Sequence, residues 1–311
     1  MKTRLTCIFS VLLTLFLFAG SLRYVRDHWL FSFTYSFQLH IGIVGALAAI
    51  VLFVVLRSRY MLLLFVWAIA ITAHAAVLRY EFIAPAGENI AGHPFKLMSF
   101  NMLGDNDANA EHIAQFIIGS AADVVYIMEG EPLAPYLARI ADAYPYRMGC
   151  LVDTETCDLL VFSKHPLDDA KFVTLSDLRH DRMAIAKVTV DDTTVNLVAL
   201  HLSKPYFDDY HEVELFNASW LMMGMQGPLI VAGDFNSSSI APDMLRFQRV
   251  NKLHVANFEP ATWPIKAGKF GIPIDHIYAR MPTTMTSLKR LPDAMGSNHF
   301  GLEAEFIIQK Q

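Results

Sequence analysis

The first eighty positions contain three long apolar runs, which are Leu5 to Leu22, Gln38 to Leu56 and Tyr60 to Leu78. Each run is close to the roughly 20 residues that a helix needs to cross about 30 Å of hydrocarbon. Charged residues stand in the breaks between the runs, where they would lie at the membrane surface. The pattern predicts a membrane anchor of three transmembrane helices over residues 1–80.

The basic residues beside these runs indicate how the anchor is oriented. With the N-terminus in the cytoplasm, four of them lie inside and three outside, namely Lys2, Arg4, Arg57 and Arg59 against Arg23, Arg26 and Arg79. Because cytoplasmic loops carry the excess of Lys and Arg, the chain after Arg79 is expected outside the cytoplasm. The first run also fits a cleaved signal peptide, since it follows Lys2 and Arg4 and ends in small residues.

A linker and a globular domain are predicted to follow the anchor. Residues 81–94 contain prolines and glycines typical of a linker, and residues 95–311 alternate short apolar segments with turns. The segments predicted as strands are 95–101, 123–128, 159–163, 184–190, 194–201, 229–233, 274–278 and 301–308, and those predicted as helices are 108–118, 132–143 and 208–225. Mixed strands with helices outside them predict an α/β layered sandwich of two sheets.

Polar residues that could take part in catalysis or ligand binding stand at the ends of the apolar strands. Asn101, Glu129 and His201 each end or follow a strand, and the others lie in the segments GDFN, IDHI and SNH, as Asp234, Asn236, Asp275 and His299. A sheet whose strands end in carboxylates, amides and imidazoles brings these groups together at one edge. The pattern therefore predicts one polar site on a rigid scaffold.

The ordered set SFN, ME, LH, GDFN, IDHI and SNH resembles the endonuclease/exonuclease/phosphatase family, which is deoxyribonuclease I-like, over essentially all of residues 95–311. The resemblance is closest to membrane-anchored bacterial members. It implies a four-layered α-β-β-α sandwich behind the three helices, and hydrolysis of phosphate esters with a divalent metal. It also implies a multi-pass protein of the bacterial inner membrane, and the count of basic residues then predicts the catalytic domain on the periplasmic side.

The resemblance also implies roles for individual residues. Glu129 and Asn298 would bind Mg²⁺ or Mn²⁺, since hard cations prefer oxygen ligands. His299, oriented by Asp275, would act on the attacking water together with Asp234.

Three further residues would contact the phosphate. They are Asn101, Asn236 and His201, and the last two are also predicted to take part in catalysis.

Two positions depart from the family pattern. Met128 stands where the family usually has Gln before the glutamate, and Glu131 is a less favoured substitute for Glu129. Asn298 stands where most members have Asp, so an oxygen is kept but a negative charge is lost. Two outcomes follow: an enzyme with weaker metal affinity, or a site that binds a phosphorylated ligand without turnover.

Three other residues keep two interpretations each. Arg182 and Lys204 could contact a phosphate or form loop ion pairs, and Trp263 could stack on a substrate or wedge its loop against the sheet.

Composition and charge limit the substrate class. Hydrophobic residues make up 54% of the chain, which is high for a soluble domain and agrees with an anchor in lipid. Of the 25 basic and 30 acidic residues, the first 94 positions hold seven and three, which leaves a net charge of about −9 for the domain. Nucleic-acid binders usually carry a basic surface. A phosphate ester of the bilayer, such as a lipid head group, is therefore favoured over DNA or RNA, and no protein partner is inferred.

Cys150 and Cys157 flank a turn-like segment between two strands. They fit either a disulfide in an oxidising compartment or two core thiols.

Overall fold

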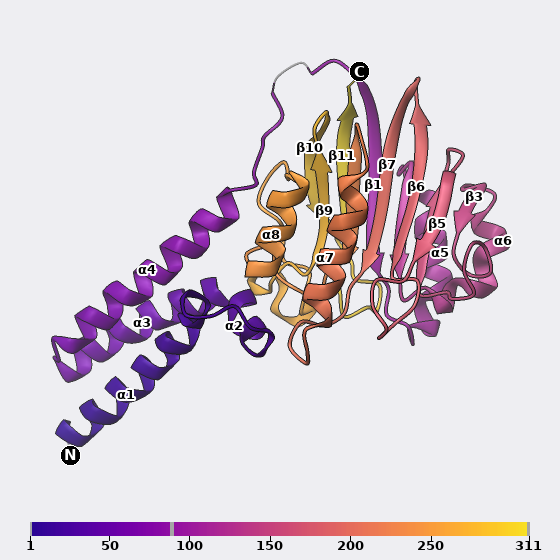
Figure 1. Cartoon of the computed structure of the whole chain (residues 1–311). Coiled ribbons are helices and arrows are strands. Elements are labelled where there is room, and N and C mark those ends of the chain that lie inside the picture. Colours follow the sequence, from indigo (N-terminus) through magenta and orange to yellow (C-terminus); the bar gives the residue numbers. More distant parts are fainter. Residues whose placement is uncertain (1, 88–89, 310–311) are drawn as a thin grey trace.

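A computed structural model describes residues 2–87 and 90–309. Figure 1 shows a bundle of helices, which projects from one side of a larger sandwich of strands and helices. The bundle and its connecting segment comprise α1 (Lys2–Gly20), α2 (Ser32–Ser36), α3 (Gln38–Leu56) and α4 (Tyr60–Tyr80), with short 3₁₀ turns at Leu22–Tyr24 and Trp29–Phe31.

Small residues let α3 approach α4 and α1 closely. A Cβ atom on Gly42 would overlap Thr72, and one on Gly45 would lie 2.5 Å from the Leu17 side chain. Such close contacts of small residues are typical of helix packing in membranes. The interior of the bundle is formed by these glycines together with buried Leu17, Ala49 and Ala68.

Two of the three expected spans, α3 and α4, are long and apolar enough to cross a membrane by length and composition. The apolar part of α1, Arg4–Gly20, is shorter. As a whole α1 has 19 residues, the same number as α3, but it begins with the basic residues Lys2 and Arg4. The prediction of three equivalent spans is thus reduced to two candidates and a shorter apolar helix.

The first sheet has six strands in the order β10-β11-β1-β2-β4-β3. These strands are β1 (His93–Asn101), β2 (Val124–Met128), β3 (Tyr146–Met148), β4 (Leu159–Ser163), β10 (Thr283–Arg290) and β11 (Leu302–Ile308). β1 and β2 are parallel, whereas β11 and β4 run antiparallel to them.

The second sheet has five strands in the order β5-β6-β7-β8-β9. They are β5 (Asp168–Val173), β6 (Met183–Val190), β7 (Thr193–His201), β8 (Leu229–Asp234) and β9 (Asp275–Arg280). The pair β7 and β8 is parallel, and the other neighbours are antiparallel.

Alternation along the strands builds two cores. Val125 and Ile127 of β2 pack on one face of the first sheet with α5 (Ala110–Gly119), while Val124 and Tyr126 face the second sheet. The other face of the second sheet is covered by α7 (Tyr210–Met223) and α8 (Pro242–Asn251). The result is a mixed α/β sandwich of two sheets with helices on both outer faces, as predicted (Figure 1).

The helix expected over residues 132–143 is not continuous. It divides into a 3₁₀ segment, Glu131–Tyr136, and one α-helical turn, α6 (Leu137–Ile140). Pro135 lies inside the first piece and cannot donate a backbone hydrogen bond, so a regular α-helix is interrupted there.

The bundle is docked on the sandwich by polar contacts. The Arg23 guanidinium donates to the Ile240 carbonyl (3.0 Å), and that of Arg79 donates to the Glu259 carbonyl (3.1 Å). The Ser36 hydroxyl accepts the backbone N–H of Ser238 (3.2 Å).

The start of the predicted linker is ordered against the same surface. Ile83 pairs with Val255, and Glu81 forms an ion pair with Arg249 (2.6 Å). The sandwich is therefore packed against the bundle and is not joined to it by a flexible linker alone.

Candidate active site

The ends of several strands meet at one edge of the sandwich. Because β1 and β2 are parallel neighbours, Asn101 at the end of β1 lies near Glu129, which follows β2. His201 at the end of β7 is in register with Asp234 at the end of β8, and Asp275 begins the antiparallel β9 opposite Asp234. The topology thus brings together the polar groups that the sequence placed at separate strand ends.

The loop before β11 adds His299 to this group. The Ser297 hydroxyl donates to the Asn101 carbonyl (2.7 Å) and accepts the backbone N–H of His299 (3.0 Å). Ser297 had no predicted role, although it begins the SNH motif. Its buried hydroxyl fixes the histidine loop to the end of β1.

His299 is held between two carboxylates. Its Nδ1 lies 2.9 Å from Asp275 Oδ2, and its Nε2 lies 3.9 Å from Asp234 Oδ2. Burial alone would lower the pKa of His299, but the charges of Asp275 and Asp234 raise it to about 9. The imidazole therefore holds a proton at neutral pH. Thr262 supports Asp275 from behind, because its hydroxyl accepts the backbone N–H groups of residues 274 and 275.

Asp234 is the centre of the hydrogen-bond network. Its carboxylate accepts the Asn101 amide (3.0 Å) and the backbone N–H of Asn236 (2.8 Å). Burial raises the pKa of Asp234, and the neighbouring Asp275 carboxylate adds to this rise. The side-chain amide of Asn236 also donates to the Leu202 carbonyl (2.9 Å), so the GDFN turn is fixed to the end of β7.

Glu129 lies on the other side of Asn101. The Asn101 amide donates to Glu129 (3.0 Å), and the backbone N–H of Gly104 donates to its other oxygen (2.8 Å). Burial acts to raise the pKa of Glu129, but these two hydrogen bonds bring it below its ordinary value. The residue adopts a positive φ of 56°, which turns it out of the strand direction at the end of β2. An ionised carboxylate thus faces the site.

His201 has a partner that sequence reasoning missed. Its Nδ1 lies 2.9 Å from Asp158 Oδ2 and also contacts Arg182, and Arg182 forms an ion pair with Asp158 (3.0 Å). Asp158 immediately precedes β4, and Arg182 immediately precedes β6. Both strands run antiparallel to a strand that ends at the site, so their starts lie at the same edge. Arg182 is therefore buried beside the imidazole and is not an exposed loop residue.

An open cleft of about 540 Å³ passes over these groups. Glu129, His201, Asp234, Asn236 and His299 all line it, as does Asn298. Asn298 is exposed, and its amide makes no hydrogen bond within the described part of the chain. Lys204 and Arg179 add positive charge to the rim.

The acidic lining fits a divalent cation. Five carboxylates line the cleft against three Lys or Arg side chains, which is an excess of negative charge. Burial raises the pKa of Glu131, and the charges of Asp158 and Glu129 add to this rise. A hard cation near Glu129 would relieve this excess. A second group with ligand atoms within 4.8 Å of one another comprises Asp234, Asp275 and His299. Because Asp275 and His299 are hydrogen-bonded to each other, this group is better suited to proton transfer than to metal binding.

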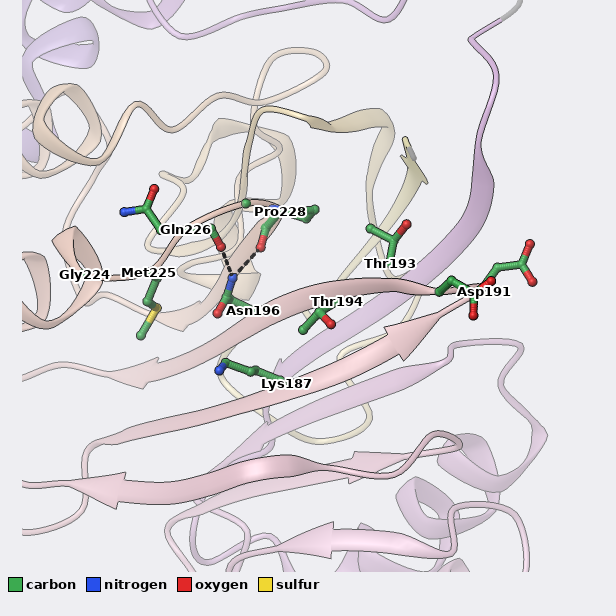
Figure 2. A pocket seen from close by; sticks show the side chains of 11 residues that line it. Lys187, Asp191, Thr193, Thr194, Asn196, Gly224, Met225, Gln226 and Pro228 are labelled. Carbon is green, nitrogen blue, oxygen red and sulfur yellow. Dashed lines mark hydrogen bonds between the residues drawn. The ribbon is translucent and has the colours of Figure 1, made fainter. Parts of the chain in front are cut away.

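A larger hollow of about 730 Å³ lies at the opposite end of β7, where β6 turns into β7. Figure 2 shows the Asn196 side chain pointing to the loop after α7, where its amide donates to the carbonyls of Gln226 (2.8 Å) and Pro228 (2.9 Å). Asp191 at the turn forms an ion pair with His93 (2.6 Å). These polar groups hold the fold together, so size alone does not identify the active site.

Comparison with known structures finds the same fold in several solved proteins. TDP2 from D. rerio, in complex with a single-strand DNA product, matches with a TM-score of 0.54 and 18% identity, over 68% of this chain and 98% of that one. Beta toxin from Staphylococcus aureus with bound magnesium ions matches at 0.53 and 15%, over 68% and 99%. Sphingomyelinase C from Streptomyces griseocarneus matches at 0.51 and 14%, over 68% and 99%.

No curated protein sequence matches the chain. The sequence model of the Endonuclease/Exonuclease/phosphatase family matches residues 98–299, a range that begins in β1 and ends at His299. This range contains all the strand-end residues of the site. The chain therefore belongs to the Endonuclease/Exonuclease/phosphatase family.

Proposed function

We propose that this chain is a membrane-anchored, divalent-metal-dependent phosphoesterase that acts on a phosphate ester at the bilayer surface. The observation that carries the proposal is the arrangement of His299 between Asp275 and Asp234, with Glu129 joined to Asp234 through the Asn101 amide. This arrangement combines a proton acceptor, a proton donor and an ionised oxygen ligand within one cleft.

The protonation states of these side chains suggest a separate role for each in the reaction. Asp234 accepts the proton of the attacking water, whose oxygen forms the new bond to phosphorus while the ester bond to the leaving oxygen breaks. His299 is protonated at rest, because its pKa is about 9, so its Nε2 donates to a phosphoryl oxygen as charge develops there. His201 protonates the leaving oxygen, and Asp158 orients its ring. Asn236 contributes a hydrogen bond to the phosphate.

A divalent cation would be held by Glu129, with the Asn298 amide oxygen as a further ligand. Mg²⁺ or Mn²⁺ bound there supplies positive charge to the phosphoryl oxygens. The ionised state of Glu129, which two hydrogen bonds maintain, supports this assignment. Asn101 remains a predicted phosphate contact, although its amide is shared between the two carboxylates.

The outward faces of the helical bundle support insertion of α1, α3 and α4 in a membrane. Large apolar side chains on all three helices are between 57% and 67% exposed, among them Leu12, Leu15, Leu47, Val54, Leu63 and Val66. Contiguous apolar surface of this kind is unfavourable in water and normal in lipid. All three helices are therefore included in the proposed anchor, although the apolar part of α1 is shorter.

Two features support an extracytoplasmic position for the sandwich. Basic residues flanking the helices favour a cytoplasmic N-terminus by four to three. Cys150 and Cys157 are joined by a disulfide, which forms and persists in oxidising compartments.

The test uses the full chain in detergent micelles with Mg²⁺ or Mn²⁺. It is offered a bis-aryl phosphodiester, an aryl monophosphate, plasmid DNA and phospholipid vesicles. We expect metal-dependent turnover that His299→Ala removes and that His112→Ala, an exposed histidine on α5, preserves. Absence of turnover on every substrate, or turnover that His299→Ala leaves intact, would contradict the proposal.

The same assay addresses two alternatives. A nuclease would cleave the plasmid in preference to lipid. The acidic lining of the cleft, in which Asp158 neutralises Arg182, disfavours this outcome. A phosphate-binding protein without activity would bind phosphate but hydrolyse nothing, and the only support for it is Asn298 in place of the usual Asp.

A further inference from the structure

A small apolar cavity opens beside the catalytic residues. Its volume is about 70 Å³, and four of its lining residues also line the catalytic cleft, namely Lys204, Asn236, Asn298 and His299. The cavity and the cleft therefore adjoin each other at these four residues. A group bonded to a phosphate in the cleft would reach the cavity directly.

The far wall of this cavity comes from the membrane anchor. Phe33 in α2 and Phe37 just after it face Trp263, Ile272 and Ile274 of the sandwich across the cavity. The two phenylalanine rings pack together with centroids 4.7 Å apart. Figure 1 shows α2 at the junction between the bundle and the sandwich.

The α2 segment is fixed in this position by its neighbours. Tyr35 is buried in the core, and Ser36 bonds to the backbone of Ser238. On the next turn, His40 Nε2 lies 2.9 Å from the Phe270 carbonyl. The aromatic wall is thus a defined part of the site.

The chemistry of the cavity differs from that of the cleft. The cleft contains five carboxylates, whereas no Asp or Glu lines the cavity among the described residues. Its formal charges are the positive charges of Lys204 and the protonated His299, both of which lie where the cavity and the cleft meet. An apolar group attached to a phosphate anion fits this distribution.

We infer that the cavity binds the hydrocarbon next to the phosphate of a membrane lipid, so that the anchor itself forms part of the substrate site. This inference rests on the proposed function and specifies its substrate class. The cavity has room for a short stretch of hydrocarbon only, and the remainder of the lipid would stay in the bilayer beside Phe33, which is exposed.

Binding of short alkyl phosphates tests the inference without relying on turnover. Methyl, butyl and hexyl phosphate would be titrated by calorimetry into the full chain in detergent with Mg²⁺. We expect the Kd to fall roughly two- to fourfold for each methylene that enters the cavity, since apolar burial favours binding to this extent. Thymidine 5′-phosphate serves as the nucleotide probe.

Three substitutions separate the cavity from general effects. Phe33→Asn should abolish the dependence of Kd on chain length while leaving methyl phosphate binding unchanged, and Phe33→Leu should largely retain the dependence. Leu30→Asn removes an equally exposed apolar residue that does not line the cavity, so it should behave as the wild type.

The outcomes are distinct. A wild-type Kd that is independent of chain length, an equal effect of Leu30→Asn, or tighter binding of thymidine 5′-phosphate than of hexyl phosphate would each overturn the lipid inference. Hydrolysis of the bis-aryl diester in the same preparation is scored separately. If hydrolysis fails while the chain-length dependence persists, then the proposed catalytic function is wrong and the lipid site stands.

Discussion

At the scale of single residues, the sequence predicted the groups that end strands but missed two groups that immediately precede strands. Asn101, His201 and Asp234 were found because an apolar strand ends at each of them. Asp158 and Arg182 precede β4 and β6, and only the antiparallel pairing of those strands brings their starts to the same edge. That pairing depends on contacts between distant segments, which no local pattern contains.

At Asn298 a neutral amide stands where most family members have a charged Asp carboxylate. Its exposed side chain lines the cleft, so Asn298→Asp would add a carboxylate without disturbing any hydrogen bond of the described structure. We expect the concentration of Mg²⁺ that gives half-maximal activity to fall roughly tenfold, because a charged oxygen ligand binds Mg²⁺ more tightly than an amide. The measurement is a Mg²⁺ titration of turnover on the bis-aryl diester.

Asn298→Ser serves as the control, because it shortens the side chain without adding charge. An unchanged Mg²⁺ requirement in Asn298→Asp would show that this position does not contact the metal.

Asp158 is expected to act through His201 as a positioning residue. Asp158→Asn would leave the ring without its carboxylate, and losses of roughly 10- to 100-fold in kcat are typical for carboxylates behind functional histidines. Asp243→Asn provides a matched control, since Asp243 pairs with another buried histidine, His211, at 2.7 Å. It should lower stability but leave kcat intact.

Thermal unfolding of both variants separates the two effects. We expect Tm to fall in both variants and kcat to fall in Asp158→Asn alone. Because Asp243→Asn then loses stability without losing activity, the positioning role of Asp158 would hold. Equal kcat values in the wild type and Asp158→Asn would refute it.

At the scale of elements, central strands were predictable and peripheral elements were not. The buried segments Val124–Met128 and Leu159–Ser163 form β2 and β4 as expected. By contrast β5, with the sequence DDAKFV, and β10, with TTMTSLKR, lie at sheet edges and carry charges, so they lack an apolar run. The helix α8 was missed because PDMLRFQRVN has few apolar positions. Edge elements are stabilised by the sheet they join, which local pattern does not reveal.

The loop between β3 and β4 is closed by the disulfide, an alternative that the sequence left open beside two free thiols. Changing both cysteines to serine should lower the free energy of unfolding by about 2 kcal/mol, because a cross-link over a short loop restricts the unfolded chain. The loop leads into Asp158, so a smaller fall in activity is also expected.

Denaturant unfolding with and without a reducing agent measures the stability effect. Reduction should destabilise the wild type and leave the double variant unaffected. An identical response of both proteins to reduction would argue against a structural cross-link.

At the scale of the whole molecule, the sequence divided the chain into anchor, linker and domain, but it did not show that the anchor contributes to the site. Apolar runs identify helices that suit lipid, yet the docking of α2 on the sandwich depends on isolated groups such as Arg23, Ser36 and Arg79. These residues have no pattern of their own. Their importance is visible only when the two parts are seen in contact.

This docking predicts that the length of the segment between α4 and β1 has little effect on turnover or ligand binding. The polar contacts of the anchor lie at or before residue 84, and a side chain added at Gly87 would meet no atom within 4 Å. Inserting four Gly and Ser residues after Gly87 should therefore preserve both turnover and the dependence of alkyl phosphate binding on chain length. The opposite result is expected when Arg23 and Arg79 are both changed to alanine, because their hydrogen bonds to Ile240 and Glu259 hold the aromatic wall against the catalytic cleft. Calorimetry on the two proteins decides between a docked domain and a flexibly linked one. If the insertion removes the dependence of Kd on chain length while the double alanine variant retains it, the domain is flexibly linked and not docked.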